Sequence, residues 1–200
     1  MEPWCKSDIT LQCLEGLIRR DLLCSWTAAE EWRLLGDEDM PSPLDRYIVS
    51  FAHFHERGFA SPAHKFLQGL LHYYKVELQH LTPNGVQHIA AFAALCEGFL
   101  GISPHFDLWQ YFFVVNLLKK QEKRQELSMP MECFGIHLSN SRVNEYPSMH
   151  LSTSNKGWHS HWFYLKDAAA APLPEFIGRL IEEAPYLWKW GVPEKDKKKI

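Results

Sequence analysis

Three stretches of sequence decide the fold of this chain. They read SPAHKFLQGLLHYY (residues 61–74), TPNGVQHIAAFAALCEGFL (residues 82–100) and SPHFDLWQYFFVVNLL (residues 103–118). Each opens on a pattern that suits a helix start, because a hydroxyl side chain caps the first turn and proline fits its first position. The opening pairs are Ser61-Pro62, Thr82-Pro83 and Ser103-Pro104, at a constant step of 21 residues. The sequence therefore predicts a helical core over about residues 59–120.

The middle stretch is the most apolar of the three and is expected to form the central helix. Its apolar residues would lie on nearly every side of a helix; they include Val86, Ile89, Phe92, Ala93, Leu95, Cys96 and Phe99. The third stretch is expected to stay helical over Phe106–Leu118. Its aromatic face is the surface that we suspect of partner contact, although burial in the core is the expected fate of most of it.

The residues on either side of this core predict further elements. An amphipathic helix is expected from Ser7 to about Leu22, and Thr27 with Glu30 forms a capping-box pattern for a second helix to about Leu35. Residues 47–51 (YIVSF) suit a strand or the start of a short helix through His55, and the pattern does not decide between the two. Later, short alternating segments between turn residues predict strands at Cys133–Leu138, Ser148–Leu151 and Trp162–Lys166.

Together these elements predict an α+β fold, with a predominantly helical core and a small aromatic-rich β region in the C-terminal third. We expect an N-terminal helical segment and acidic loop over residues 1–45. The main domain is expected over residues 46–166, with a helical block at 59–120 and a strand-rich block at 130–166. A linker, a short helix and a charged tail are expected over residues 167–200.

Composition narrows the class of protein. With 46% hydrophobic residues among 200, the chain can bury a substantial core, and its net charge of −3 disfavours a protein that coats nucleic acid electrostatically. The sequence holds no run of 18 uncharged apolar residues and no secretory signal pattern, so no membrane partner is expected. Its five scattered cysteines include no Cys-x-x-Cys pair, which favours reduced thiols and an intracellular location, nuclear or cytoplasmic.

Residues that could carry catalysis or bind a metal are few. Two His-x-His pairs, His53/His55 and His159/His161, would each place two imidazoles on one face of a strand, but no acid or cysteine joins them at a recognisable spacing. The remaining histidines are interpreted as interfacial or capping residues. The sequence has no nucleophile elbow and no phosphate-binding glycine loop. We therefore expect no enzyme activity, no catalytic residue, no metal, no cofactor and no small-molecule substrate.

The best candidate for a contact with nucleic acid or another partner is the segment over residues 156–164 (KGWHSHWFY). Aromatic side chains beside a lysine can stack on the bases of a single strand. The candidate contact residues are Lys156, Trp158, His159, His161, Trp162 and Tyr164. Packing of these aromatic rings between the β region and the helices is the alternative, and the acidic net charge favours it.

Several motifs of the helical core form one recognisable set, at residues 81–90 (LTPNGVQHIA), 95–102 (LCEGFLGI) and 104–109 (PHFDLW). The set extends upstream to residues 55–59 (HERGF) and 62–71 (PAHKFLQGLL), and downstream to residues 154–159 (SNKGWH) and 162–164 (WFY). Together these motifs resemble the gypsy-type transposon domain, a family of plant proteins. The resemblance implies a region of a retrotransposon-derived protein and supplies no catalytic residues.

The function expected from these observations is a non-enzymatic interaction or assembly domain, gag-like and derived from a transposable element. Self-association is the partner relationship we expect first. The alternative is a module that binds single-stranded nucleic acid through Lys156–Tyr164.

Overall fold

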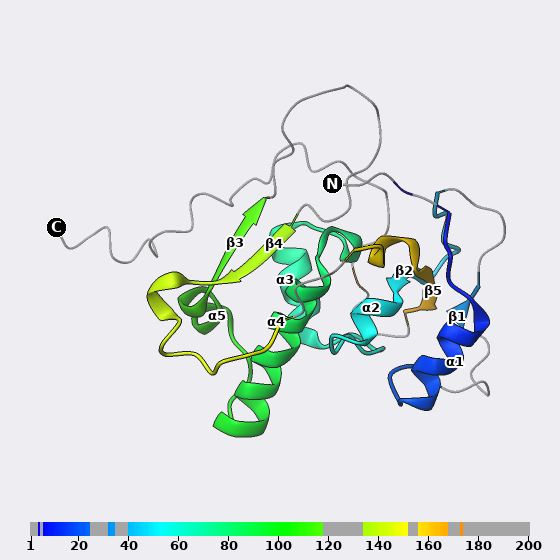
Figure 1. Ribbon diagram of the computed structural model, residues 1–200. Helices are drawn as coiled ribbons and strands as arrows, with labels where there is room; N and C mark the ends of the chain where they lie inside the picture. Colours follow the sequence, from blue (N-terminus) through cyan, green and yellow to red (C-terminus); the bar gives the residue numbers. More distant parts are fainter. Residues whose placement is uncertain are drawn as a thin grey trace.

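The computed structural model describes residues 4, 6–24, 32–34, 40–117, 134–151, 156–167 and 173. Over these residues the chain forms α-helices and two small antiparallel sheets, so the fold is α+β, as the sequence predicts (Figure 1). No helix in this part of the chain has the length and apolar character needed to cross a bilayer.

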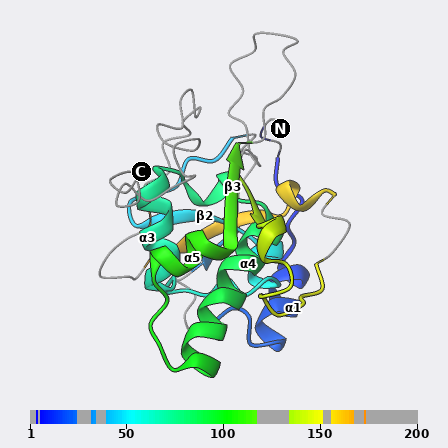
Figure 2. The ribbon, with the colours of Figure 1, turned by 90° about the vertical axis from the view of Figure 1, so that its left-hand side faces the viewer.

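The helices α3 (Lys65–Tyr74) and α4 (Pro83–Ala94) lie in the middle of the molecule, with one sheet on either side (Figure 1). The last turns of α4 widen into a π-helical segment, η3 (Leu95–Leu100), and the chain then returns through α5 (Phe106–Phe112). In both views the end formed by η3 projects beyond the neighbouring helices and strands (Figures 1 and 2).

One of the three predicted helix starts is correct. Thr82 caps α4, with its Oγ1 accepting a hydrogen bond from the backbone N–H of Gly85 at 3.0 Å and Pro83 at the first helical position. The predicted starts at Ser61 and Ser103 are wrong, because α3 and α5 begin at Lys65 and Phe106 after histidine caps. A serine–proline pair thus precedes each of these two helices without capping it.

The third stretch does not stay helical to residue 118. Helix α5 ends at Phe112, and Phe113–Leu117 form strand β3, which pairs in antiparallel fashion with β4 (Phe134–Leu138). The pair Val114-Val115 suits a strand because branching at Cβ is tolerated better there than in a helix. Strand β4 confirms the predicted strand at this position over its described residues, whereas Ser148–Leu151 form no strand.

The second sheet joins segments that lie far apart in the sequence. Its middle strand is β5 (Trp162–Lys166), as predicted, and β2 (Tyr47–Phe51) and the two-residue β1 (Trp32–Arg33) flank it in antiparallel orientation. Residues 47–51 are therefore a strand, which leads directly into the short helix α2 (Ala52–His55). The helix predicted from Thr27 is wrong at Trp32 and Arg33, and residues 25–31 lie outside the described part.

The N-terminal helix α1 (Leu11–Arg19) starts later than predicted. Its cap is Thr10, whose side chain accepts a hydrogen bond from the N–H of Cys13. The hydroxyl of Ser7 instead donates to the backbone oxygen of Trp162 at 2.6 Å and so ties the N-terminal segment to β5. The short helix and charged tail predicted after residue 173 lie outside the described residues.

A single hydrophobic core runs through the helices and both sheets. Leu14 and Leu17 bring α1 into it, so the described part of residues 1–45 packs against the rest of the fold. Its largest fully buried side chains are Trp109, Trp158, Trp162, Phe51, Phe54, Phe92, Phe134 and Phe163.

Candidate functional site

The two His-x-His pairs approach each other in the structure, but as a pair of rings rather than a set of ligands. The imidazoles of His53 and His161 lie edge to face with centroids 5.6 Å apart. The Nδ1 atom of His161 is 3.0 Å from the carbonyl oxygen of Gly157, to which it donates. No three His, Cys, Asp or Glu side chains among the described residues are grouped closely enough to hold a metal ion.

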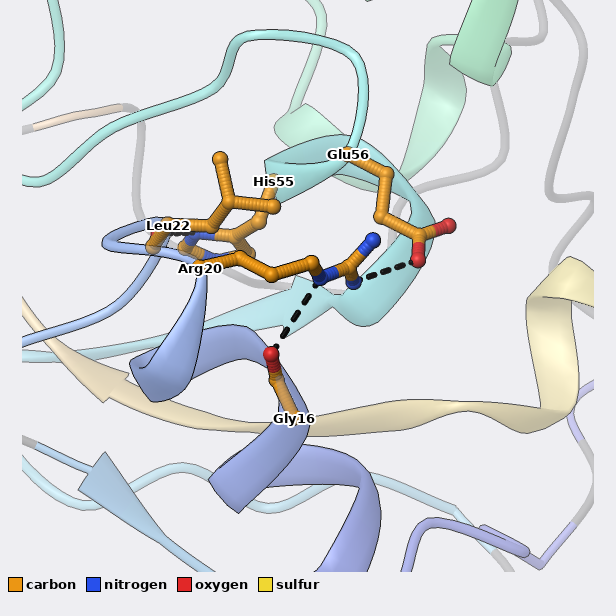
Figure 3. Close-up of polar contacts among 5 residues, drawn as sticks. All are labelled: Gly16, Arg20, Leu22, His55 and Glu56. Carbon is orange, nitrogen blue, oxygen red and sulfur yellow. Dashed lines mark hydrogen bonds and ion pairs between the residues drawn. The ribbon is translucent and has the colours of Figure 1, made fainter.

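His55 has a structural role in fastening α1 to α2 (Figure 3). Its Nδ1 donates to the carbonyl oxygen of Leu22 at 3.0 Å, and its Nε2 lies 2.9 Å from the Oγ of Ser50, whose hydroxyl therefore donates to it. Burial lowers the pKa of His55 to about 4, so the imidazole stays neutral at physiological pH. A serine beside a histidine acts as a nucleophile only where it reaches a substrate, and Ser50 is completely buried.

An exposed ion pair lies beside this buried contact. Arg20, at the end of α1, donates through Nε to the carbonyl oxygen of Gly16 and through a terminal nitrogen to Oε1 of Glu56 at 2.7 Å (Figure 3). A cavity of about 460 Å³ is lined in part by Leu22 and His55, the residues of the buried contact. Because both ring nitrogens of His55 are bonded to protein groups, this cavity adjoins a structural network and not a set of groups arranged for proton transfer.

Three other histidines cap helices, which confirms their interpretation as capping residues. The Nδ1 of His64 accepts from the N–H of Phe66 at 3.1 Å, and the Nδ1 of His105 accepts from that of Leu108 at 3.3 Å. His80 closes a capping box by accepting from the N–H of Glu77 at 2.9 Å. These imidazoles satisfy backbone donors that a helix start would otherwise leave unpaired.

The segment over residues 156–164 does not present its aromatic rings to solvent. Trp158 and Trp162 are completely buried and Tyr164 is nearly so, which leaves no ring face on which a base could stack. This burial is the packing alternative that the net charge favours. The ring of Trp158 packs against Phe51 of β2 and Phe54 of α2. Lys156 is exposed, and His159 and His161 are half-buried.

A mostly apolar concavity lies between α3 and the start of α5. It has a volume of about 730 Å³, and we call it the α3–α5 groove. Its mostly apolar wall includes Ala63, Phe66, Gly69, Leu70, Tyr73, Pro104 and Phe106. Polar groups enter at one side, where Nε2 of His64 lies 3.1 Å from Oε1 of Glu97. A concavity of this size and character is typical of binding sites for apolar groups.

Beside the groove, the projecting end of η3 exposes large apolar side chains. Phe99 is 84% exposed, Leu100 55% and Ile102 40%. We call these three residues the η3 tip. The turn ends at Gly101, whose φ of +65° allows a tight left-handed cap, and Ile102 donates its N–H to the carbonyl oxygen of Cys96 at 3.0 Å. The tip is thus a hydrogen-bonded helix end with an apolar surface.

Sequence reasoning missed the η3 tip because it counted Phe99 with the core of the central helix. A signal was present in GFLG at residues 98–101, where two glycines enclose two large apolar residues at the end of a helix. Within the suspected contact region Phe106–Leu118, Trp109, Phe113 and Val115 are buried, while Tyr111 and Val114 are exposed.

Residues 48–117 match a family model described as "Putative gypsy type transposon". No curated protein and no solved structure matches the chain. The matched segment holds α3, α4, η3 and α5, and with them both the α3–α5 groove and the η3 tip. Over residues 48–117 the chain is therefore similar to the gypsy-type transposon family, as its sequence motifs suggest.

Proposed function

We propose that this chain is a non-enzymatic interaction and assembly domain of a transposon-derived protein, with a gag-like role. The observation that supports it best is the η3 tip beside the α3–α5 groove, a large exposed apolar surface on the transposon-family segment. Contiguous apolar surface rimmed by polar residues is characteristic of protein interaction sites.

The free energy available from this surface is large enough for association. Burying one Phe or Leu side chain is worth about 1.5 to 3 kcal/mol, and the tip offers three large apolar residues. Part of this free energy is offset by the lost freedom of two molecules, so a contact in the micromolar to millimolar range is expected.

The distribution of polar groups favours a protein partner over a substrate or a nucleic acid. The histidines at positions 55, 64, 80 and 105 are used in hydrogen bonds that hold the fold. The aromatic rings of residues 156–164 are in the core, and the chain carries a net charge of −3. Nucleic-acid binding through that segment is therefore not favoured.

The test is the molar mass of the purified full chain, measured by size-exclusion chromatography with light scattering from about 1 μM to about 1 mM. We expect a mass above the 23.3 kDa of one chain that rises with concentration. A mass that stays at one chain over the whole range would contradict self-association. A shift that needs added single-stranded nucleic acid would point to the alternative function instead.

A further inference from the structure

We infer that the partner is a second copy of this chain, which places its η3 tip in the α3–α5 groove of the first copy, head to tail. The inference rests on the proposed function and specifies its contact. Phe99 is the central residue of the inserted tip, and Gly69 lines the groove that receives it.

The tip has the shape of a group that inserts. It lies at the end of a helix that projects from the body of the molecule (Figures 1 and 2), and its most exposed residue is a phenylalanine. Aromatic side chains that enter an apolar pocket commonly dominate the energy of an interface. The π-helical turn that carries Phe99 is itself a geometry found often at functional sites.

The groove has the size and lining that such a group requires. Its volume of about 730 Å³ accommodates several apolar side chains. The ring of Tyr73 lies 4.3 Å from that of Phe106, so α3 and α5 supply a continuous aromatic wall. Gly69 lines the groove at a point with open space, since a Cβ atom at this position would meet no atom within 4 Å.

The positions of tip and groove on η3 argue for head-to-tail association. Glu97 lines the groove, and Phe99 follows it two positions later. Residues two apart on a helix do not face each other, so Phe99 projects to a different side of η3 from the groove. A surface that fits a pocket on another side of the same molecule makes a heterologous contact, which grows into a chain or closes into a ring.

Two substitutions separate the two halves of the contact. Phe99→Ser removes the central side chain of the tip. Because Phe99 is 84% exposed, the substitution should not lower the stability of the fold. Gly69→Glu puts a charged side chain into the groove at a helical position with open space, where glutamate also favours the helix over glycine. The matched controls are Leu44→Ser, at another exposed apolar residue, and Gly16→Glu, at another open helical glycine.

The experiment compares the masses of these chains by light scattering, alone and mixed. We expect wild type and both controls to exceed two chains at high concentration. Each of the two test variants should associate at least about tenfold more weakly. Their equimolar mixture should recover association but stop at two chains, because the intact tip of Gly69→Glu enters the intact groove of Phe99→Ser and no further contact remains.

The outcomes that would overturn the inference differ from the one that would overturn the proposed function. Wild type that associates while the mixture stays monomeric would show assembly through another surface. Wild type that stops at two chains would show a two-fold contact and not a head-to-tail one. Circular dichroism of each variant establishes that it is folded. Wild type that stays monomeric at every concentration would contradict the proposed function itself.

Discussion

Gly58 lies so close to Ala90 that a Cβ atom built on the glycine would stand 2.7 Å from the Cβ of the alanine. The backbone of the turn after α2 thus contacts the side chain of Ala90 on α4, at a distance that only glycine permits. Gly58 also has a φ of +92°, a conformation that other residues rarely adopt. This contact sets how closely α2 and the sheet that precedes it approach the central helix.

Gly58→Ala is expected to lower the free energy of unfolding by about 2 to 4 kcal/mol, because backbone strain and overlap with Ala90 add. Gly157→Ala is the matched control, since it shares the positive φ (+74°) but a Cβ there meets nothing within 4 Å. Its cost should be about 1 to 2 kcal/mol. Adding Ala90→Gly to Gly58→Ala should recover the part of the cost that comes from overlap with Ala90. Urea unfolding of wild type, the two single variants and the double variant measures each cost. Equal costs at Gly58 and Gly157 would contradict the close contact.

The buried hydrogen bonds of His55 predict a strong effect of its removal. His55→Leu leaves the carbonyl oxygen of Leu22 and the hydroxyl of Ser50 without this partner, and should cost about 2 to 4 kcal/mol at neutral pH. The double variant Ser50→Ala/His55→Leu should be more stable than His55→Leu alone, since it no longer buries an unpaired hydroxyl. Denaturant unfolding gives both values, and additive costs in the double variant would argue against the bond.

Another buried imidazole, that of His88 on α4, predicts a dependence of stability on pH. Burial, followed by repulsion from His137, lowers the pKa of His88 from its ordinary 6.5 to about 4. Between pH 6.5 and about pH 4, His88 is therefore mostly protonated in the unfolded chain and mostly neutral in the folded chain. The contribution of His88 to the free energy of unfolding is fully present above pH 6.5. It is lost as the pH falls from 6.5 toward 4, by at most about 1.4 kcal/mol per pH unit.

The variant His88→Phe should flatten this dependence. Phenylalanine fills the site next to Phe113, whose ring centroid lies 5.2 Å from that of His88, and it takes up no proton. The urea midpoint of the variant should fall less steeply than that of wild type between pH 6.5 and 4. Above pH 6.5 the two curves should run parallel, which serves as the internal control. Equal slopes in the acid range would show that His88 does not contribute.

The attachment of α1 offers a comparison between apolar burial and an exposed ion pair. Leu17→Ala should cost about 2 to 5 kcal/mol, because Leu17 is 1% exposed and its removal leaves a cavity. Arg20→Ala breaks the ion pair with Glu56, in which both side chains are largely exposed, and should cost less than about 1 kcal/mol. Thermal unfolding ranks the two, and the reverse order would mean that α1 is held mainly by charge.

Parts of the fold could be predicted because their signals are local. Thr82-Pro83 caps a helix whose first turns are apolar on the side that faces the core, and residues 162–166 are aromatic and apolar, as suits a buried strand. Where the outcome depends on distant residues the same reasoning failed. His64 caps α3 while its other nitrogen contacts Glu97, 33 residues away, and no pattern around Ser61 reports that contact.

The same limit explains the errors at β3 and at the η3 tip. Val114 and Val115 favour a strand but can also lie in a helix, and it is pairing with β4, beyond residue 133, that makes them a strand. Phe99 is as apolar as the buried Phe92 on the same helical run, and only the length of α4 and η3 relative to the body of the molecule leaves it in solvent. Hydrophobicity predicts a preference for burial but not whether a neighbour is present to cover the residue.

The middle position of β5 in its sheet affects how the chain folds during synthesis and which fragments of it can fold. Strand β2 is synthesised about 110 residues before β5, the strand that pairs with it. Phe51 therefore has no pairing partner until Trp162 has been made, after most of the helical core. Such long-range pairing slows folding. A fragment cut to residues 48–117 would carry β2 without β5 and would expose its buried face. The unit that folds therefore extends beyond the segment that matches the family model.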